Sequence, residues 1–212
     1  CGLSIPRGAI GLILYFCKET GTQYQIIDQR RTLPEQDFTF TGILKGYQQS
    51  ATTDILSRDF GVLQALTGSG KTVMALSIIA ERRQPCLIIV HSKELLSQWV
   101  ERTEEFLAIP RAEIGIIGNG KMKIGERITV GIINSIYPIA GTLKDFFGHI
   151  VVDECHRCPS RSFTEAVTAW SVKTPRHMNT RNASEYFATR GGTCAGPGRV
   201  VRSEIFSRTA RR

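Results

Sequence analysis

One short segment combines glycines, a lysine and a hydroxyl at the spacing that binds a chain of phosphates. It reads Ala-Leu-Thr-Gly-Ser-Gly-Lys-Thr over residues 65–72, between an apolar run and a helical pattern. Glycines let backbone N–H groups turn inward around phosphates, and a helix N-terminus favours negative charge. Lys71 would reach the β- and γ-phosphates, and Thr72 would place its hydroxyl on Mg²⁺. An ordinary turn is the disfavoured alternative to a phosphate-binding loop made of Thr67, Gly68, Ser69, Gly70, Lys71 and Thr72.

A second segment offers two acids at the end of an apolar strand. Residues 149–156 read His-Ile-Val-Val-Asp-Glu-Cys-His. Ligands of parallel sheets bind at the carboxyl ends of the strands, so these acids are expected beside the phosphate loop. Asp153 is the candidate for holding Mg²⁺ through water, and Glu154 for orienting and deprotonating an attacking water. A solvated acidic turn is the alternative if this motif is taken alone.

The cysteines do not favour a metal or a disulfide framework. The sequence has six, at irregular spacing and without a secretion signal, which favours free thiols and a cytoplasmic protein. Cys155 and Cys158 form a Cys-His-Arg-Cys stretch, but no second Cys/His pair follows at zinc-site spacing. No apolar run approaches the roughly 20 residues that a membrane span needs, so no membrane partner is expected.

The elements that must position these residues are short apolar strands alternating with helices from Gly42 onward. Such alternation predicts an α/β fold, a parallel sheet with helices on both faces. Helices are expected at 71–82 and 93–107, and strands at 61–65, 87–90, 114–117, 128–133 and 149–152.

The two ends of the chain differ from this middle part. Residues 1–40 suggest a partial accessory α/β domain and linker, with a helix over 8–19 and a strand over 24–28; a missing N-terminus is expected because Cys1 is not Met. Residues 171–212 lack apolar periodicity and hold most of the net charge of +8, so a disordered basic tail is expected. The predicted domains are therefore 1–40, 41–170 and 171–212.

Together the Gly-Ser-Gly-Lys-Thr and Asp-Glu-Cys-His motifs resemble superfamily 2 helicases and translocases of the DEAD/DEAH group. The nearest branch is that of excision-repair helicases and the translocating subunits of restriction enzymes, and the resemblance covers residues 40–170. It implies a RecA-like P-loop domain that uses ATP and Mg²⁺, with Lys71 and Glu154 catalytic. It also implies a nucleic-acid partner, DNA favoured over RNA, and a second RecA-like domain that this chain lacks.

Three further segments follow in the order of this family. Within Leu44–Gln49, Gln48 matches a residue that reads adenine; a surface glutamine is the alternative. The segments Leu87–Trp99 and Thr129–Tyr137 resemble motifs that contact the nucleic-acid backbone, against the alternatives of a core Trp99 and a plain loop cap. Their polar candidates are His91, Ser92, Lys93, Gln98, Asn134 and Ser135.

The expected function is that of the ATP-binding and hydrolysing domain of a DNA helicase or translocase. The alternative is a catalytically incomplete remnant that binds nucleotide or nucleic acid, because the family's Ser/Thr-Ala-Thr-Pro motif is not found. Codons for Arg181–Ser184 can yield Ala-Thr-Pro in another frame, so a frameshifted tail is one hypothesis and a natural basic tail the other. A P-loop kinase is disfavoured because no acceptor site is evident.

Overall fold

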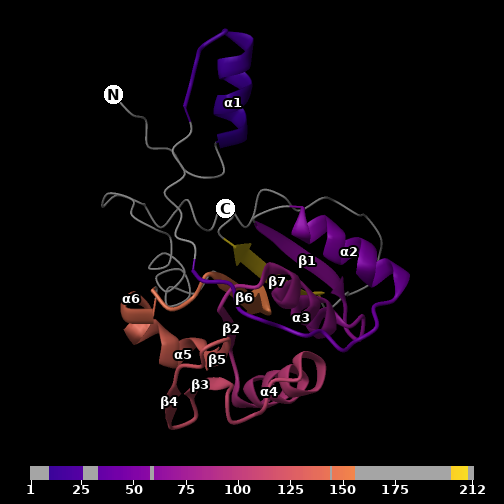
Figure 1. The fold of residues 1–212 in the computed structure, drawn as a ribbon, viewed down its shortest axis with the longest axis vertical. Helices are drawn as coiled ribbons and strands as arrows, with labels where there is room; N and C mark the ends of the chain where they lie inside the picture. Colours follow the sequence, from indigo (N-terminus) through magenta and orange to yellow (C-terminus); the bar gives the residue numbers. More distant parts are fainter. Residues whose placement is uncertain (1–9, 26–32, 58–59, 144, 156–201, 210–212) are drawn as a thin grey trace. The chain divides into compact units, whose positions relative to one another are not determined.

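The computed structural model describes residues 10–25, 33–57, 60–143, 145–155 and 202–209 (Figure 1). The chain divides into two compact units. One consists of Cys1–Arg30 with Ser171–Ala195, and the other of Arg31–Trp170 with Gly196–Arg212. The second unit contains the sheet and every residue of the two chemical motifs.

A seven-stranded sheet forms the centre of this unit, in the order β1-β7-β6-β2-β5-β3-β4. Its central strands β6, β2, β5 and β3 are parallel, and β1 runs in the same direction because β1 and β6 are both antiparallel to β7. Only β4 and β7 run the other way among the described strands. The strands are β1 (Phe60–Leu66), β2 (Cys86–Val90), β3 (Gly115–Gly118), β4 (Lys121–Lys123), β5 (Ile128–Ile132), β6 (His149–Asp153) and β7 (Arg202–Thr209).

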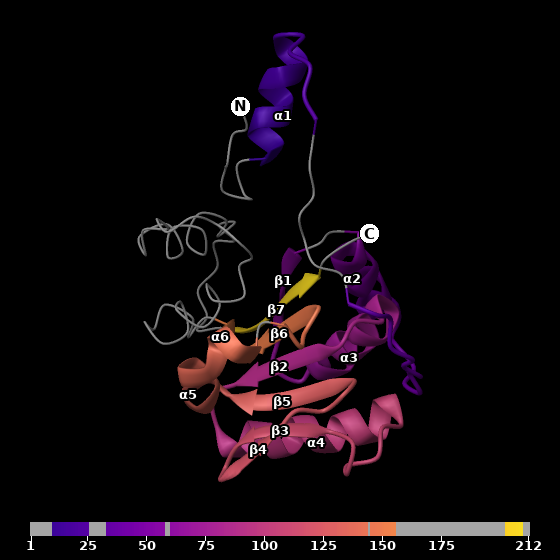
Figure 2. The ribbon, with the colours of Figure 1, turned by 60° about the vertical axis from the view of Figure 1, so that its left-hand side comes forward.

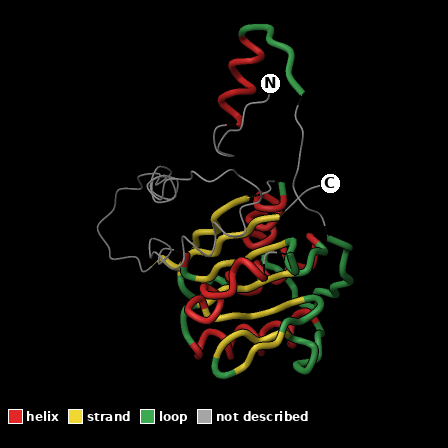
Figure 3. The backbone as a smooth tube through the Cα atoms, turned by 90° about the vertical axis from the view of Figure 1, so that its left-hand side faces the viewer, coloured by secondary structure: helices red, strands yellow, loops and turns green. Residues whose placement is uncertain are grey.

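Both faces of the sheet are covered, as the sequence predicted. On β2, Cys86, Ile88 and Val90 join the core cluster that includes α3 (Lys71–Arg82) and α4 (Lys93–Leu107). The alternate residues Leu87 and Ile89 face the opposite cluster. That second cluster holds α5 (Ile133–Ile136) and α6 (Ala140–Leu143), which a short 3-10 turn joins at Tyr137–Ile139. Figure 3 shows helices on either side of the strands.

The two long helices have the bounds predicted from their sequence. α4 begins where the side chain of Ser92 accepts a hydrogen bond from the backbone of Leu95, and it ends at Ala108 in the left-handed conformation. One face of α4 is buried, at the spacing of an amphipathic helix. The buried residues on that face are Leu96, Trp99, Val100, Thr103 and Leu107.

The expected linker is attached to this unit rather than free of it. Backbone N–H groups of Gln36 and Thr41 donate to the carbonyls of Arg83 and Phe106, at the ends of α3 and α4. The next element, α2 (Gly46–Leu56), packs beside α3. Extended chain over residues 33–45 therefore places α2 against the sheet.

The other unit contains helix α1 (Ile10–Glu19), close to the helix predicted over 8–19. Of the strand expected over 24–28, Tyr24 and Gln25 are irregular and the remainder lies outside the described residues. In the part of the chain that the structure describes, no helix has the length and apolar character that crossing a bilayer requires.

Strand β7 is the main difference from the sequence prediction. We expected no element after Trp170, yet Arg202–Thr209 pairs with β1 along seven residues and with β6 along five. Its sequence lacks the apolar run of a central strand, so composition did not reveal it. Backbone hydrogen bonds to β1 and β6 stabilise this strand, and its side-chain pattern does not reveal them. The rest of 171–212, including Arg181–Ser184, lies outside the described residues.

Candidate functional site

The predicted site residues that follow the strands lie at one edge of the sheet, where the parallel strands end. Val90 is paired with Ile132, and Ile89 with Val152, so β2, β5 and β6 end side by side. β1 points the same way and leads into the glycine-rich loop (Figure 2). The carboxyl edge therefore gathers the loop 67–70, residues 91–93, residues 133–135 and the acids 153–154.

The glycine-rich loop has the backbone that a phosphate cradle requires. Gly68 and Gly70 both lie in the left-handed region, each at φ +81°. Ser69 N–H donates to the carbonyl of Leu66 at 3.2 Å, which closes the turn. Gly70 is the N-cap of α3, so the first N–H groups of a 12-residue helix face the loop.

Lys71 points back toward the end of β1. Its ammonium donates to the carbonyl of Ala65 at 3.1 Å and to that of Leu66 at 2.9 Å. Thr72 follows in the first turn of α3 and is half-buried. The lysine is therefore held at the mouth of the loop by neutral backbone acceptors, which a phosphate would replace with a charged one.

Gln48 connects helix α2 to this loop. Its amide nitrogen donates to the carbonyl of Ser69 at 2.9 Å, and its amide oxygen accepts from the backbone of Lys45 at 2.8 Å. A methyl group on Gly70 would come within 2.4 Å of the Gln48 amide nitrogen, so the two residues fit only because Gly70 has no side chain. Sequence reasoning missed Tyr47, whose hydroxyl donates to the same Ser69 carbonyl at 3.1 Å.

The first acid, Asp153, is held by hydrogen bonds to both carboxylate oxygens. Oδ1 accepts from the backbone N–H of Glu154 at 2.9 Å, and Oδ2 accepts from the indole Nε1 of Trp99 at 2.8 Å. Trp99 is a core residue, 1% exposed, as one of the two sequence interpretations had it. Its bond to an acid 54 residues away was not predicted.

Glu154 turns away from the strand direction. Its φ of +55° lies in the left-handed region, which non-glycine residues enter rarely and mostly at turns or functional sites. The backbone conformation of Glu154 therefore differs from that of the strand that ends at Asp153. Both acids are half-buried.

The loop and the acids are separated by the width of one strand. β7 lies between β1 and β6, so these two strands are about 10 Å apart at the usual spacing. Phosphate groups and a hydrated cation are the right size for such a gap. Thr72 and Asp153 offer only oxygen donors, which are the ligands that Mg²⁺ prefers, so the donor set fits this ion.

The candidates for nucleic-acid contact are spread along the same edge. Lys93, Gln98 and Asn134 are exposed, whereas His91, Ser92 and Ser135 are half-buried. Because Ser92 caps α4, its hydroxyl already has a structural role. Because β2 and β5 are neighbouring strands, residues 91–93 lie near residues 133–135. Gln98 lies further along α4.

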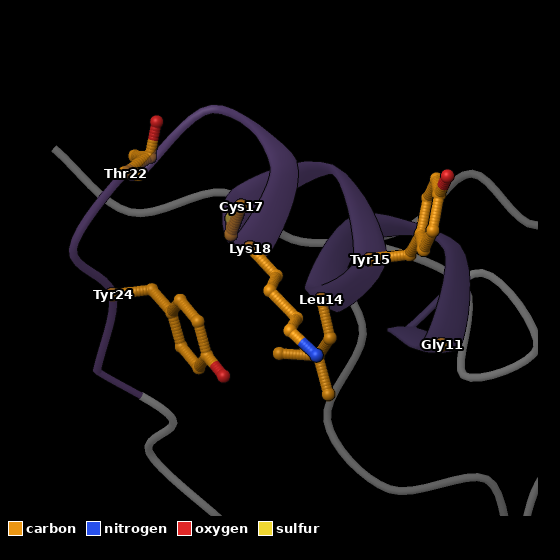
Figure 4. Close-up of a pocket in the computed structure, with 8 residues that line it drawn as sticks. Gly11, Leu14, Tyr15, Cys17, Lys18, Thr22 and Tyr24 are labelled. Carbon is orange, nitrogen blue, oxygen red and sulfur yellow. The ribbon is translucent and has the colours of Figure 1, made fainter.

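The cysteines and a hollow beside α1 are two other places in the described residues where a site could be sought, and neither contains the predicted chemistry. Cys155 is buried, Cys158 lies outside the described residues, and the described part holds no cluster of three or more His, Cys, Asp or Glu residues that could bind a metal. A hollow on α1 contains none of the predicted site residues. Figure 4 shows Leu14, Lys18 and Tyr24 among the residues that line it.

Comparison with known proteins identifies a family and several similar proteins. Residues 42–187 match the family described as type III restriction enzyme, res subunit. The chain is 34% identical over 121 residues to "DNA 3'-5' translocase XPB2" of Sulfurisphaera tokodaii, covering 57% of this chain and 27% of that protein. It is 28% identical over 144 residues to "Probable helicase D10" of Escherichia phage T5, covering 68% and 31%.

A solved structure has a similar fold. The UvsW helicase of bacteriophage T4 superposes with a TM-score of 0.58 at 19% identity, over 78% of this chain and 67% of that one. The chain thus spans less than a third of the length of either curated relative, 27% and 31%.

Proposed function

The chain belongs to the type III restriction enzyme res subunit family, and we propose that its α/β unit binds and hydrolyses ATP to drive movement along nucleic acid. The observation that carries this proposal is the meeting of a lysine-bearing glycine loop and two acids at one edge of the sheet. DNA is favoured over RNA because the relative at 34% identity is named a DNA translocase.

The roles of the loop residues follow from where they lie. Residues Thr67–Gly70 would surround the phosphates with backbone N–H groups, at a helix N-terminus that favours negative charge. Lys71 would exchange the carbonyls of Ala65 and Leu66 for β- and γ-phosphate oxygens. These contacts would strengthen as charge develops during transfer, which is how such a loop contributes to rate.

Thr72 and Asp153 would hold Mg²⁺, the threonine through its hydroxyl and the acid through water. Bound there, the ion would neutralise charge on the phosphates. Glu154 would orient a water molecule and accept its proton, and its left-handed backbone would aim the carboxylate separately from that of Asp153.

Gln48 would read the adenine edge from beside the loop. Its position supports this role, since it is 6% exposed and contacts the Ser69 carbonyl. A change in the shape of the loop would break or shift this hydrogen bond and so would affect α2. Tyr47 shares the acceptor and would help to hold the loop in register.

Nucleic acid would lie across the ends of β2 and β5. Lys93 and Asn134 are exposed there and would contact the phosphate backbone, together with His91, Ser92, Gln98 and Ser135. Such contacts fix position without reading sequence. A second RecA-like domain, on the same or another chain, would supply the opposing wall of the cleft and an arginine to the transferred phosphate.

Phosphate release by the chain, measured with single-stranded DNA, duplex DNA and RNA, tests the proposal. We expect Mg²⁺-dependent release that DNA stimulates more than RNA, and that Lys71→Ala abolishes. Binding of Mg·ATPγS without any release would instead favour the incomplete remnant. If the folded chain showed no nucleotide binding and no phosphate release, the proposal would be refuted.

A further inference from the structure

The hydrogen bond between Trp99 and Asp153 joins the hydrophobic core to the acid proposed to hold the metal. Trp99 lies in the middle of α4 and is 1% exposed. The indole N–H can only donate, and a buried donor needs an acceptor. The Asp153 Oδ2 atom provides one at 2.8 Å.

This bond fixes the direction of the carboxylate. Oδ1 is held by the backbone N–H of Glu154 at 2.9 Å while Oδ2 is held by Trp99, so rotation about the side chain would break two bonds at once. It would also leave the indole donor buried without a partner, which is unfavourable. The carboxylate is therefore oriented before any ligand arrives.

The arrangement leaves the carboxylate able to bind. Each carboxylate oxygen has two lone-pair directions, and each uses one of them here. Asp153 is half-buried rather than sealed in the core, so the remaining lone-pair directions suit contact with water or a hydrated cation. The Trp99 bond is therefore compatible with metal binding at the same group.

We propose that Trp99 is a positioning residue, which holds the Asp153 carboxylate in the orientation that Mg²⁺ requires. The inference rests on the proposed function, and it adds a residue that neither motif contains. Groups that hold a metal's ligand from behind commonly change metal affinity 10–100-fold when they are removed.

The first test reads the indole directly. The chain has two tryptophans, so Trp170→Phe leaves Trp99 as the one indole. In ¹⁵N-labelled protein, we expect its Nε1–H resonance to move when Mg·ATPγS binds, and to broaden when Mn²⁺ replaces Mg²⁺. A resonance that stays unchanged while calorimetry shows binding would overturn the inference.

The second test removes the donor and keeps an aromatic ring. With Trp99→Phe at saturating ATPγS, we expect Mg²⁺ affinity to fall about tenfold or more, while ATPγS affinity in EDTA stays the same. The matched control is Phe106→Leu, on the same helix and packed against Phe40, which should lower stability without changing Mg²⁺ affinity. Wild-type Mg²⁺ affinity in Trp99→Phe would contradict the inference.

These outcomes separate the inference from the proposed function. If the unaltered chain folds but binds no Mg·ATPγS, both are wrong. If it binds and Trp99→Phe binds Mg²⁺ equally well, only the role of Trp99 is wrong. Should Trp99→Phe fail to fold, the indole resonance of the Trp170→Phe chain decides alone.

Discussion

Lys71 donates to the carbonyl of Leu66 at 2.9 Å, so the catalytic lysine candidate is bonded to the strand that precedes its own loop. A second bond to the Ala65 carbonyl, at 3.1 Å, holds it in the same place. Nucleotide binding must therefore exchange two neutral acceptors for phosphate oxygens. That exchange is favourable because hydrogen bonds between charged groups are stronger than those to neutral carbonyls.

Replacing Lys71 by alanine removes the charge that would meet the phosphates. We expect ATPγS affinity, measured by calorimetry, to fall by about tenfold or more, which corresponds to about 1.4 kcal/mol or more. Lys121→Ala, in the exposed strand β4, is the matched control and should bind normally. Equal affinity in the Lys71 and Lys121 variants would contradict the assigned role.

The two loop glycines should differ in their tolerance of alanine. Both have φ +81°, so each substitution costs roughly 1–2 kcal/mol of backbone strain. Only at Gly70 does the added carbon meet Gln48, which would have to give up its bond to Ser69. We expect Gly70→Ala to lower the free energy of unfolding by about 1 kcal/mol more than Gly68→Ala does.

A double variant checks that this difference comes from Gln48. In urea unfolding, Gln48→Ala and Gly70→Ala together should cost less than the sum of the single changes, because both remove the same hydrogen bond. Strict additivity would show that the two residues act independently.

Glu154→Gln should separate binding from turnover. The amide cannot accept a proton, so we expect phosphate release to drop by roughly 10²–10⁴-fold with ATPγS affinity unchanged. Quenched-flow and calorimetric measurements on the same preparation give both quantities. Unchanged turnover would rule out Glu154 as the general base.

Lys93 should contribute charge to nucleic-acid binding without contributing sequence preference. We expect Lys93→Ala to weaken binding to DNAs of different sequence equally, and to lower the slope of log K against log salt by about one. Fluorescence anisotropy over a range of salt measures both. A sequence-dependent loss, or an effect as small as that of Lys121→Ala, would argue against a phosphate contact.

His149 should make the fold sensitive to acid. Burial, and secondarily the charge of Arg82, holds its pKa well below the usual value, so the folded protein keeps the ring neutral. The unfolded chain binds the proton below about pH 6.5. Stability is therefore complete above that pH and falls as the pH decreases, by up to about 1.4 kcal/mol per unit from this residue.

Urea unfolding between pH 7.5 and 5 measures this dependence. His149→Gln, which cannot take up a proton, should lose stability more slowly with acid than the unaltered chain. His91→Gln, at the end of β2, serves as the control for removing a histidine. Identical pH dependence in the unaltered and His149→Gln chains would refute the assignment.

The sequence was sufficient for the elements whose side chains carry a local pattern. The spacing of apolar residues and the flanking Gly and Pro residues predict helices 71–82 and 93–107. The apolar run before Asp153 predicts the strand that ends there. β7 escaped prediction because its pairing with β1 and β6 is made by the backbone, between segments far apart in the chain.

The same reason applies within the site. The loop and acid motifs are local patterns, so their residues could be proposed without a structure. Trp99 has no motif linking it to Asp153, and only the packing of α4 against β5 and α3 brings the indole to the carboxylate. Gln48 was proposed from its motif, but its bond to Ser69 depends on how α2 packs against the loop.

A structure of the chain with Mg²⁺ and ATPγS is the most direct measurement of the central claim. We expect the Lys71 ammonium to leave the Leu66 carbonyl for the β- and γ-phosphates, with one metal ion between Thr72 and Asp153. A nucleotide bound away from this edge, or a metal ion that Thr72 and Asp153 do not share, would contradict the account.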